Sequence, residues 1–171
     1  KPTKYIGKRY TKQEADEMTT DFGWHFKEQE EGKYRRVVPS PMPEYIMHGK
    51  SIKALVDRGT IVIASGGGGI PVYNNSLGKL EGLDAVIDKD YSAAKMGRII
   101  RAHELWIITD VDAVYENFGS SNQKRVSSMT KEEAEILYDE GLFQKGSIAP
   151  KVRAAIHFLK HHGNKVIITS I

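Results

Sequence analysis

The sequence contains no cysteine and no long apolar run, and each absence removes a class of protein. Without cysteine the chain forms no disulfide and offers no thiolate to a metal ion, which is compatible with an intracellular location. The apolar stretches all fall short of the roughly 18 residues that a membrane-spanning helix needs. We therefore expect a cytoplasmic protein with no membrane partner.

An excess of charge of one sign is also missing. Lysine and arginine total 25 and aspartate and glutamate total 22, so the formal net charge is +3. This balance does not indicate a nucleic-acid partner, and the sequence contains no arginine-rich run. We therefore expect no nucleic-acid partner. At 171 residues the chain is long enough for one domain with a sizeable core.

Both ends of the sequence suggest a piece of a longer protein. The first residue is Lys1 and not Met, and the polar start shows no apolar segment of a signal peptide. Residues 165–171 have the composition of a buried strand that is cut off at its end. We therefore expect further segments of the protein to lie outside this chain.

Local patterns near the amino terminus predict a helix and a hairpin after a basic, turn-rich start. Thr11 at an N-cap position, with Glu14 three residues later, has the pattern of a capping box for a helix over residues 12–19. Residues 24–29 and 34–38 flank a glycine-containing turn and predict a β-hairpin.

A proline-rich connector separates this part from the rest of the chain. Three prolines lie within residues 39–43 and preclude a regular helix or a central strand there. We therefore expect residues 5–40 to form a small subdomain and residues 41–171 to form the main α/β part.

Beyond the connector, short apolar runs alternate with helical patterns. This alternation predicts β–α–β units, and nearly all-apolar strands are typical of a parallel sheet that is covered on both faces. The predicted strands are residues 60–64, 85–87, 104–109 and 165–169, and the predicted helices begin near residues 47, 91, 131 and 150. The pattern therefore predicts the α/β class.

Four consecutive glycines, Gly66, Gly67, Gly68 and Gly69, follow the first of these predicted strands. Glycine permits positive φ and a close approach of ligand to backbone, and exposed N–H groups at a strand end can cradle an anion. The run matches neither a Walker A loop nor the dinucleotide-binding fingerprint. A flexible loop is the alternative, although four glycines beside a strand carry a folding entropy cost that a simple loop does not require.

Charged residues follow two further predicted strands. Asp88, Lys89 and Asp90 lie between a strand and a helix, where an open α/β sheet binds ligands, and they form either a phosphate site or a solvated turn with an N-cap. Asp110 can accept a hydrogen bond from a ribose hydroxyl and Tyr115 can pack on a base. The alternative there is an Asx-type turn with a core tyrosine.

A lysine at a helix start completes the set. Lys151 follows Pro150 at the second position of a predicted helix, where a positive charge opposes the helix dipole unless an anion lies there too. A solvated surface lysine is the alternative. No covalent nucleophile stands out, and the combination suits phosphoryl transfer, in which positioning and charge neutralisation provide most of the catalysis.

Four runs of the sequence form a set with a fixed order and spacing. They lie at residues 36–41, 62–72, 81–90 and 108–115 and include Ser-Gly-Gly-Gly-Gly-Ile-Pro and Ile-Asp-Lys-Asp. These runs resemble the carbamate kinases of the amino acid kinase superfamily. The resemblance covers essentially the whole chain in order and spacing. It implies a three-layer αβα sandwich with a mainly parallel central sheet and a small protruding subdomain.

The resemblance also implies an activity. Members of this family catalyse the reversible reaction of ATP and carbamate to ADP and carbamoyl phosphate, which generates ATP in fermentative arginine catabolism. Mg²⁺ is carried with the nucleotide, and the enzymes form homodimers. Another amino acid kinase that acts on a different acid, or a non-catalytic nucleotide-binding fragment, remains as an alternative.

The resemblance assigns roles to single residues. Lys89 matches the lysine that contacts the transferring phosphoryl group, and Asp90 matches the carboxylate that orients the catalytic lysines. Lys151 matches the nucleotide-side lysine, and Lys4, by itself an ordinary surface lysine, matches a lysine that reaches the phosphates. The implied nucleotide-binding residues are Asp110, Val111, Ala113, Tyr115, Ile148 and Lys151; the implied phosphate and substrate loop is Gly66, Gly67, Gly68 and Gly69; no metal ligand is implied.

The chain departs from the family pattern in two respects. Where the family has Gly-Ser-Met-Gly-Pro-Lys, this chain has Gly146-Ser147-Ile148-Ala149-Pro-Lys, so Ile148 keeps an apolar contact but Ala149 disfavours a positive φ. The family's chains are also longer. We expect their amino-terminal, carbamate-binding half and a final helical segment to lie outside this chain.

Overall fold

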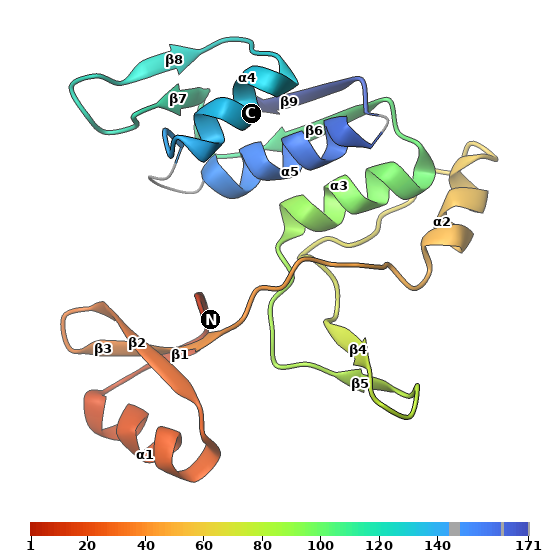
Figure 1. The fold of residues 1–171 in the computed structure, drawn as a ribbon. Coiled ribbons are helices and arrows are strands. Elements are labelled where there is room, and N and C mark those ends of the chain that lie inside the picture. Colours follow the sequence, from red (N-terminus) through yellow and green to blue (C-terminus); the bar gives the residue numbers. More distant parts are fainter. Residues whose placement is uncertain (144–147, 162, 171) are drawn as a thin grey trace. The chain divides into compact units, whose positions relative to one another are not determined.

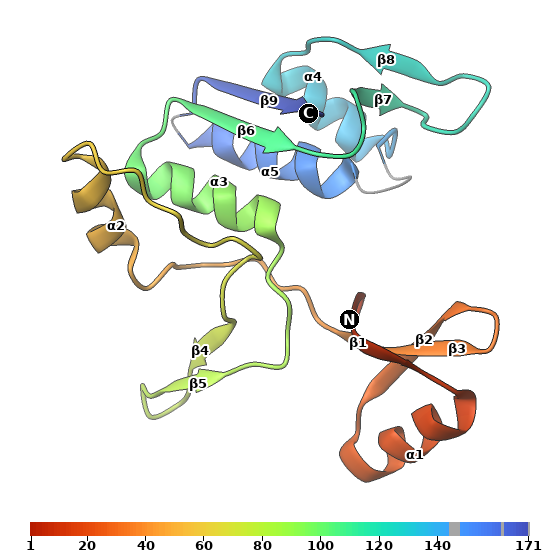
Figure 2. The same cartoon turned by 180° about the vertical axis from the view of Figure 1, so that it is seen from behind.

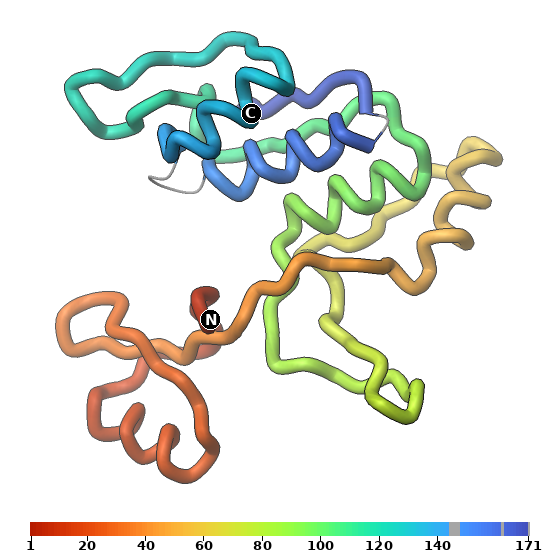
Figure 3. Tube along the Cα trace, viewed as in Figure 1, coloured from red at the N-terminus to blue at the C-terminus, as the bar shows by residue number. Residues whose placement is uncertain are grey.

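The computed structural model describes residues 1–143, 148–161 and 163–170. The chain forms two compact units. The first unit contains Lys1–Met42 and Ile70–Ile87, and the second contains Pro43–Gly69 and Asp88–Ile171. The tube in Figure 3 follows the chain along this path, from the amino-terminal segment in red to the last strand in blue.

The first unit is built on a three-stranded antiparallel sheet with the strand order β1–β3–β2. Its elements are β1 (Lys4–Tyr10), α1 (Lys12–Phe22), β2 (His25–Glu30) and β3 (Lys33–Val38), and α1 packs on the sheet (Figure 1). The predicted helix and hairpin are confirmed. β1 was not predicted, because its mixed sequence has no clear period and it becomes a strand only through its pairing with β3.

The predicted capping box begins α1. The hydroxyl oxygen of Thr11 accepts a hydrogen bond from the Glu14 backbone N–H, and the Glu14 carboxylate accepts one from the Thr11 backbone N–H. Each bond satisfies a donor that a helix start leaves without an intrahelical partner. Gly23, at φ 66°, ends the helix in the left-handed conformation that favours glycine.

The first unit also takes in the segment Ile70–Ile87, so it is larger than residues 5–40. This segment carries a second hairpin, β4 (Val72–Asn74) and β5 (Leu80–Gly82). Asp84 forms an ion pair with Arg36 of β3 at 2.6 Å, and the Val86 backbone N–H donates to the Pro39 carbonyl at 3.0 Å. The strand predicted at residues 85–87 is therefore wrong, because these residues contact an irregular connector and not a neighbouring strand.

The second unit contains a parallel pair of strands, in which Leu105 lies opposite Val166. Helices cover one face of this pair (Figure 1). The elements of the second unit are α2 (Gly49–Val56), α3 (Lys89–Ile100), β6 (Glu104–Ile108), β7 (Val114–Glu116), β8 (Lys124–Val126), α4 (Lys131–Asp139), α5 (Ile148–Lys160) and β9 (Lys165–Thr169). The predicted strands at β6 and β9 and the predicted helices are confirmed, whereas the β7–β8 hairpin was not predicted.

Two apolar clusters hold the helices against the sheet. Ala94 of α3 packs on Ala154 and Phe158 of α5, and Leu105 and Val166 join them from the strands. The second cluster consists of Val114, Ala134, Phe143, Ile148, Val152 and Ile156. Since the central members of both clusters are buried and Leu105 and Val166 are partly buried, the clusters fix α5 between α3 and α4.

One face of the β6–β9 pair has no covering layer among the described residues. In Figure 2, which shows the molecule from behind, no helix of the second unit lies over the near face of these strands. Trp106 and Ile108 of β6 are 58% and 49% exposed. The α/β class is confirmed, but the expectation of strands that are covered on both faces is wrong for this part of the chain.

The strand predicted at residues 60–64 is also absent from the described structure. The segment has no strand partner there, and Ile61 and Ile63 are 93% and 98% exposed. A strand forms only when a neighbour bonds its backbone groups. The prediction of a buried strand at residues 60–64 is therefore wrong, because the described residues supply neither a neighbouring strand nor a covering layer.

A histidine at the contact between α3 and α5 should make stability depend on pH. Burial, and then the nearby His161, Lys95, Arg98 and Lys160, lower the pKa of His157. Because the pKa is lower in the folded state, the unfolded chain binds a proton first as pH falls below about 6.5. The contribution of neutral His157 is therefore complete above that pH and is lost as pH falls.

We expect the His157→Gln variant to lose part of this dependence. Its free energy of unfolding in urea should fall less between about pH 7 and about pH 5 than that of the unaltered protein. Equal slopes for the two proteins would contradict the assignment.

No helix in the described ranges combines the length and the apolar character needed to cross a bilayer.

Candidate functional site

The amino-terminal turn of α3 places three of the predicted site residues. Asp88 is the N-cap, and its carboxylate accepts a hydrogen bond from the Asp90 backbone N–H at 2.9 Å. Lys89 is the first helical residue and is exposed, whereas Asp88 and Asp90 are buried. The cap explains why the helix begins here, and the alternation of buried carboxylates with an exposed lysine directs only Lys89 toward solvent.

Asp90 and Lys151 form a buried ion pair between two helices. The Nζ atom of Lys151 lies 3.0 Å from a carboxylate oxygen of Asp90, and the residues are 6% and 7% exposed. The positive charge at the start of α5 therefore has an anion beside it, namely a carboxylate from α3. The pair joins the starts of the two helices at the point where Lys89 emerges.

The start of α5 differs slightly from the prediction. The helix begins at Ile148, so Lys151 is its fourth residue and not its second, and Ala149 lies within the helix. Helical backbone suits alanine, so the substitution for the family's glycine introduces no strain in this structure. Gly146 and Ser147 lie outside the described residues.

The glycine segment forms a tight turn. The Gly68 backbone N–H donates to the Ser65 carbonyl at 2.7 Å, and Ser65, Gly68 and Gly69 have φ values of 59°, 117° and 94°. The value at Gly68 lies in a region that side chains disfavour, so glycine is required there. A Cβ atom added at Gly66 or Gly67 would meet no atom within 4 Å, so their backbone faces open space.

The glycine turn and the start of α3 share a cavity of about 270 Å³. Its polar lining comes from Ser65, Gly66, Lys89 and Glu104. Apolar side chains, among them Ala93, Met96 and Leu105, line the remainder. The structure therefore brings together a predicted loop residue and the predicted phosphoryl-binding lysine, which are 23 positions apart in the sequence.

The predicted nucleotide segment is partly exposed and partly buried. Asp110 is exposed and Tyr115 is half-buried, and the Tyr115 hydroxyl donates to the Asp112 carboxylate at 3.1 Å. This hydrogen bond raises the pKa of the Tyr115 phenol above its ordinary value, and partial burial adds to the effect. Val111 and Ile148 belong to one apolar cluster, so these two predicted contacts lie close together.

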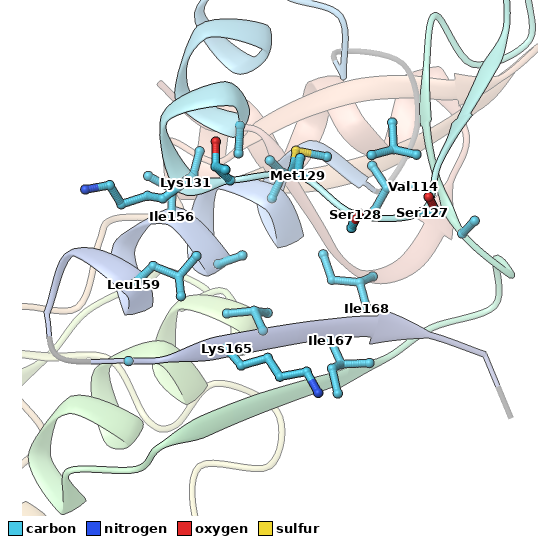
Figure 4. A pocket seen from close by; sticks show the side chains of 18 of the residues that line it. Val114, Ser127, Ser128, Met129, Lys131, Ile156, Leu159, Lys165, Ile167 and Ile168 are labelled. Carbon is cyan, nitrogen blue, oxygen red and sulfur yellow. The ribbon is translucent and has the colours of Figure 1, made fainter.

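Ala113 is buried and lines a larger cavity of about 760 Å³. Figure 4 shows this cavity between α5, β9 and the start of α4, with Ile156, Leu159 and Ile168 among its apolar lining. None of the other predicted nucleotide residues lines it. The Asp90–Lys151 pair is likewise absent from its walls, so the charged site is centred elsewhere in the unit.

Lys4 belongs to the first unit. It is the first residue of β1, where it lies opposite Val38, and its side chain is half-buried. Its predicted role at the phosphates stays a prediction.

The sequence patterns missed one buried polar residue near this site. Ser92 follows Lys89 by three positions in α3, and its hydroxyl donates to the Gly68 carbonyl at 2.6 Å. A serine inside a predicted amphipathic helix gives no local signal, because only the folded structure brings Gly68 beside it.

Comparisons with known proteins agree with the resemblance. A model of the amino acid kinase family matches residues 8–170. The chain is 45% identical to the carbamate kinase of Staphylococcus haemolyticus over 171 residues, which are 99% of this chain and 55% of that protein. It is also 45% identical to the carbamate kinase of Thermoplasma volcanium over 170 residues, with the same coverage of each chain.

A solved structure matches the fold as well. Carbamate kinase from Giardia lamblia bound to AMP-PNP has a TM-score of 0.88 and 38% sequence identity, over 99% of this chain and 54% of that one. The chain spans about half the length of the curated relatives it matches.

Proposed function

This chain belongs to the amino acid kinase family, and we propose that it forms the nucleotide-binding part of a carbamate kinase. The complete enzyme would convert ATP and carbamate reversibly to ADP and carbamoyl phosphate. The identity of 45% to carbamate kinases over 99% of the chain is the observation that carries this proposal. The buried pair of Asp90 and Lys151 beside the exposed Lys89 supports it.

In this mechanism an oxygen of carbamate attacks the γ-phosphorus of ATP. The bond from that phosphorus to the bridging oxygen breaks, and ADP leaves as the oxyanion. Carbamate is already an anion, so its attack needs no general base. The work of the protein is to hold the reactants in line and to neutralise charge on the transferring group.

Lys89 is the residue that we assign to the moving phosphoryl group. Its side chain is exposed and lines the same cavity as Gly66 of the glycine turn. The space beside the backbone of Gly66 and Gly67 is free of other atoms, which leaves room for phosphate oxygens. A lysine provides a compact charge with three donors, which suits a group whose charge is spread over three oxygens.

Asp90 holds Lys151 and does not take a proton. Its carboxylate is buried and 3.0 Å from the Lys151 Nζ atom, so it is paired with a cation and turned away from solvent. A cation that is already positioned stabilises developing charge without reorganisation during the reaction. Lys151 then serves the nucleotide side, together with Asp110, Val111, Ala113, Tyr115 and Ile148.

We assign the Mg²⁺ ion to the nucleotide. Among the residues that the structure describes, no three His, Cys, Asp or Glu side chains gather as a metal site. Mg²⁺ in kinase sites is held by substrate phosphates with one or two carboxylates, so no dedicated cage is needed. From the resemblance we further propose a cytoplasmic homodimer that generates ATP in arginine breakdown.

The experiment that tests this function is ATP synthesis by the complete protein from ADP and carbamoyl phosphate, detected with a coupled reporter. Saturable ATP formation supports the proposal. Phosphorylation of glutamate derivatives, with no reaction of carbamoyl phosphate, would assign the protein to another branch of the family. Saturable binding of ADP without any transfer would identify a nucleotide-binding module.

A further inference from the structure

Ser92 is an inward-facing residue to which the proposed mechanism gives no task. It lies in the first turns of α3 and is 1% exposed. Its hydroxyl donates to the Gly68 carbonyl at 2.6 Å, and its backbone N–H donates to the Asp88 carbonyl at 3.0 Å. One residue therefore connects the glycine turn to the helix start that carries Lys89.

The partner of this hydrogen bond is conformationally special. Gly68 is buried and has φ 117°, and its own N–H closes the turn on the Ser65 carbonyl. A buried carbonyl that loses its donor is destabilised, so the turn would shift to find another partner or water. The Ser92 hydroxyl thus selects one conformation of a segment that four glycines would otherwise leave permissive.

The chain path makes this connection more important. The chain leaves the second unit after Gly69 and returns at Asp88. The covalent path from Gly68 to Lys89 therefore runs through the segment Ile70–Ile87, which belongs to the first unit. The hydrogen bond between Ser92 and Gly68 supplies a direct connection across this interruption.

We propose that Ser92 is a positioning residue, whose buried hydroxyl holds the Gly68 carbonyl so that the glycine turn and Lys89 keep lining one cavity. This inference rests on the proposed function, in which the turn and Lys89 act on the same phosphoryl group. A serine hydroxyl suits the task because it is small enough for a fully buried site and adds a donor without a charge.

The test uses Ser92→Ala in the complete protein, with Ser51→Ala as the matched control. Ser51 is an exposed serine in helix α2, so the control repeats the same chemical change in a helix away from the turn. We expect Ser92→Ala to raise the KM for carbamoyl phosphate about tenfold, the size of effect typical of one lost hydrogen bond. The KM for ADP should change little, and the control should change neither constant.

A second measurement does not depend on activity. The Gly68 backbone N–H, which closes the turn on the Ser65 carbonyl, should exchange hydrogen faster in Ser92→Ala than in the unaltered protein and in the control. A Ser92→Thr variant keeps the hydroxyl and should restore slow exchange, provided that its melting temperature shows the added methyl group to be accommodated. If the added methyl group is not accommodated, the comparison of Ser92→Ala with Ser51→Ala tests the inference by itself.

The outcomes separate the inference from the proposed function. Unchanged exchange at the turn, or an equal rise of both KM values, would overturn the positioning role. Absence of ATP synthesis by the unaltered protein would instead refute the proposed function, and the exchange data would still decide whether Ser92 holds the turn. Faster exchange together with a selective rise in the KM for carbamoyl phosphate supports both.

Discussion

Replacing Lys89 with alanine should lower the turnover of the complete enzyme by about 10²- to 10³-fold, which is the usual cost of removing one preorganised group that stabilises transition-state charge. The lysine acts on charge that is rearranged as the phosphoryl group moves. Its loss should therefore reduce kcat and kcat/KM by similar factors, whereas a group that binds the ground state equally well would alter mainly KM.

The position of Lys89 makes this variant interpretable. Its side chain is exposed at the first position of α3, and the cap at Asp88 does not depend on it. The melting temperature of Lys89→Ala should therefore stay close to that of the unaltered protein. Lys79→Ala, which removes another exposed lysine from the β4–β5 turn, is the matched control and should keep its turnover. Near-normal turnover in Lys89→Ala would refute the assignment.

Replacing Lys151 with methionine should cost about 3–5 kcal/mol of stability, as is typical when one partner of a buried ion pair is removed. The apolar stem of methionine fills much of the space of the lysine, so the cost comes from the Asp90 carboxylate, which stays buried without its cation. The free energy of unfolding in urea measures this loss directly.

Two further variants separate the charge effect from the packing effect. In the double variant Lys151→Met with Asp90→Leu, no charge is left buried, and most of the stability should return because apolar pairs of similar volume often replace buried ion pairs at little cost. Catalysis should remain lost in both variants. Lys53→Met breaks the exposed pair with Asp57 on α2 and should cost at most about 1 kcal/mol. If Lys151→Met costs no more than this control, the pair does not stabilise the fold.

Local signals predicted the helix starts well. The capping box at Thr11 and the N-cap at Asp88 are both present, because each cap needs only residues within one turn of the chain. The same reasoning placed Lys89 and its two flanking carboxylates directly before a helix, which in the structure begins at Lys89 itself. These features follow from short-range sequence alone.

Strand prediction failed where pairing, and not composition, decides the structure. The apolar residues 60–64 form no strand among the described residues, since no neighbour bonds to them, whereas the mixed sequence of β1 forms one along β3. Within the part of the chain that the structure describes, the short strands β7 and β8 likewise pair only with each other. A strand is a property of two segments, and a pattern within one segment does not report the second.

The sequence by itself determined the α/β class, the helix caps and the set of charged and glycine residues that suit phosphoryl transfer. Only the tertiary structure decided which of them meet. Lys151 donates to Asp90, which lies 61 positions earlier in the sequence, because α3 packs on α5. Ser92 donates to Gly68, which lies 24 positions earlier, because the chain returns to the second unit at Asp88. Local propensity is set by neighbours in the chain, whereas a charge pair or a buried hydrogen bond is set by neighbours in space.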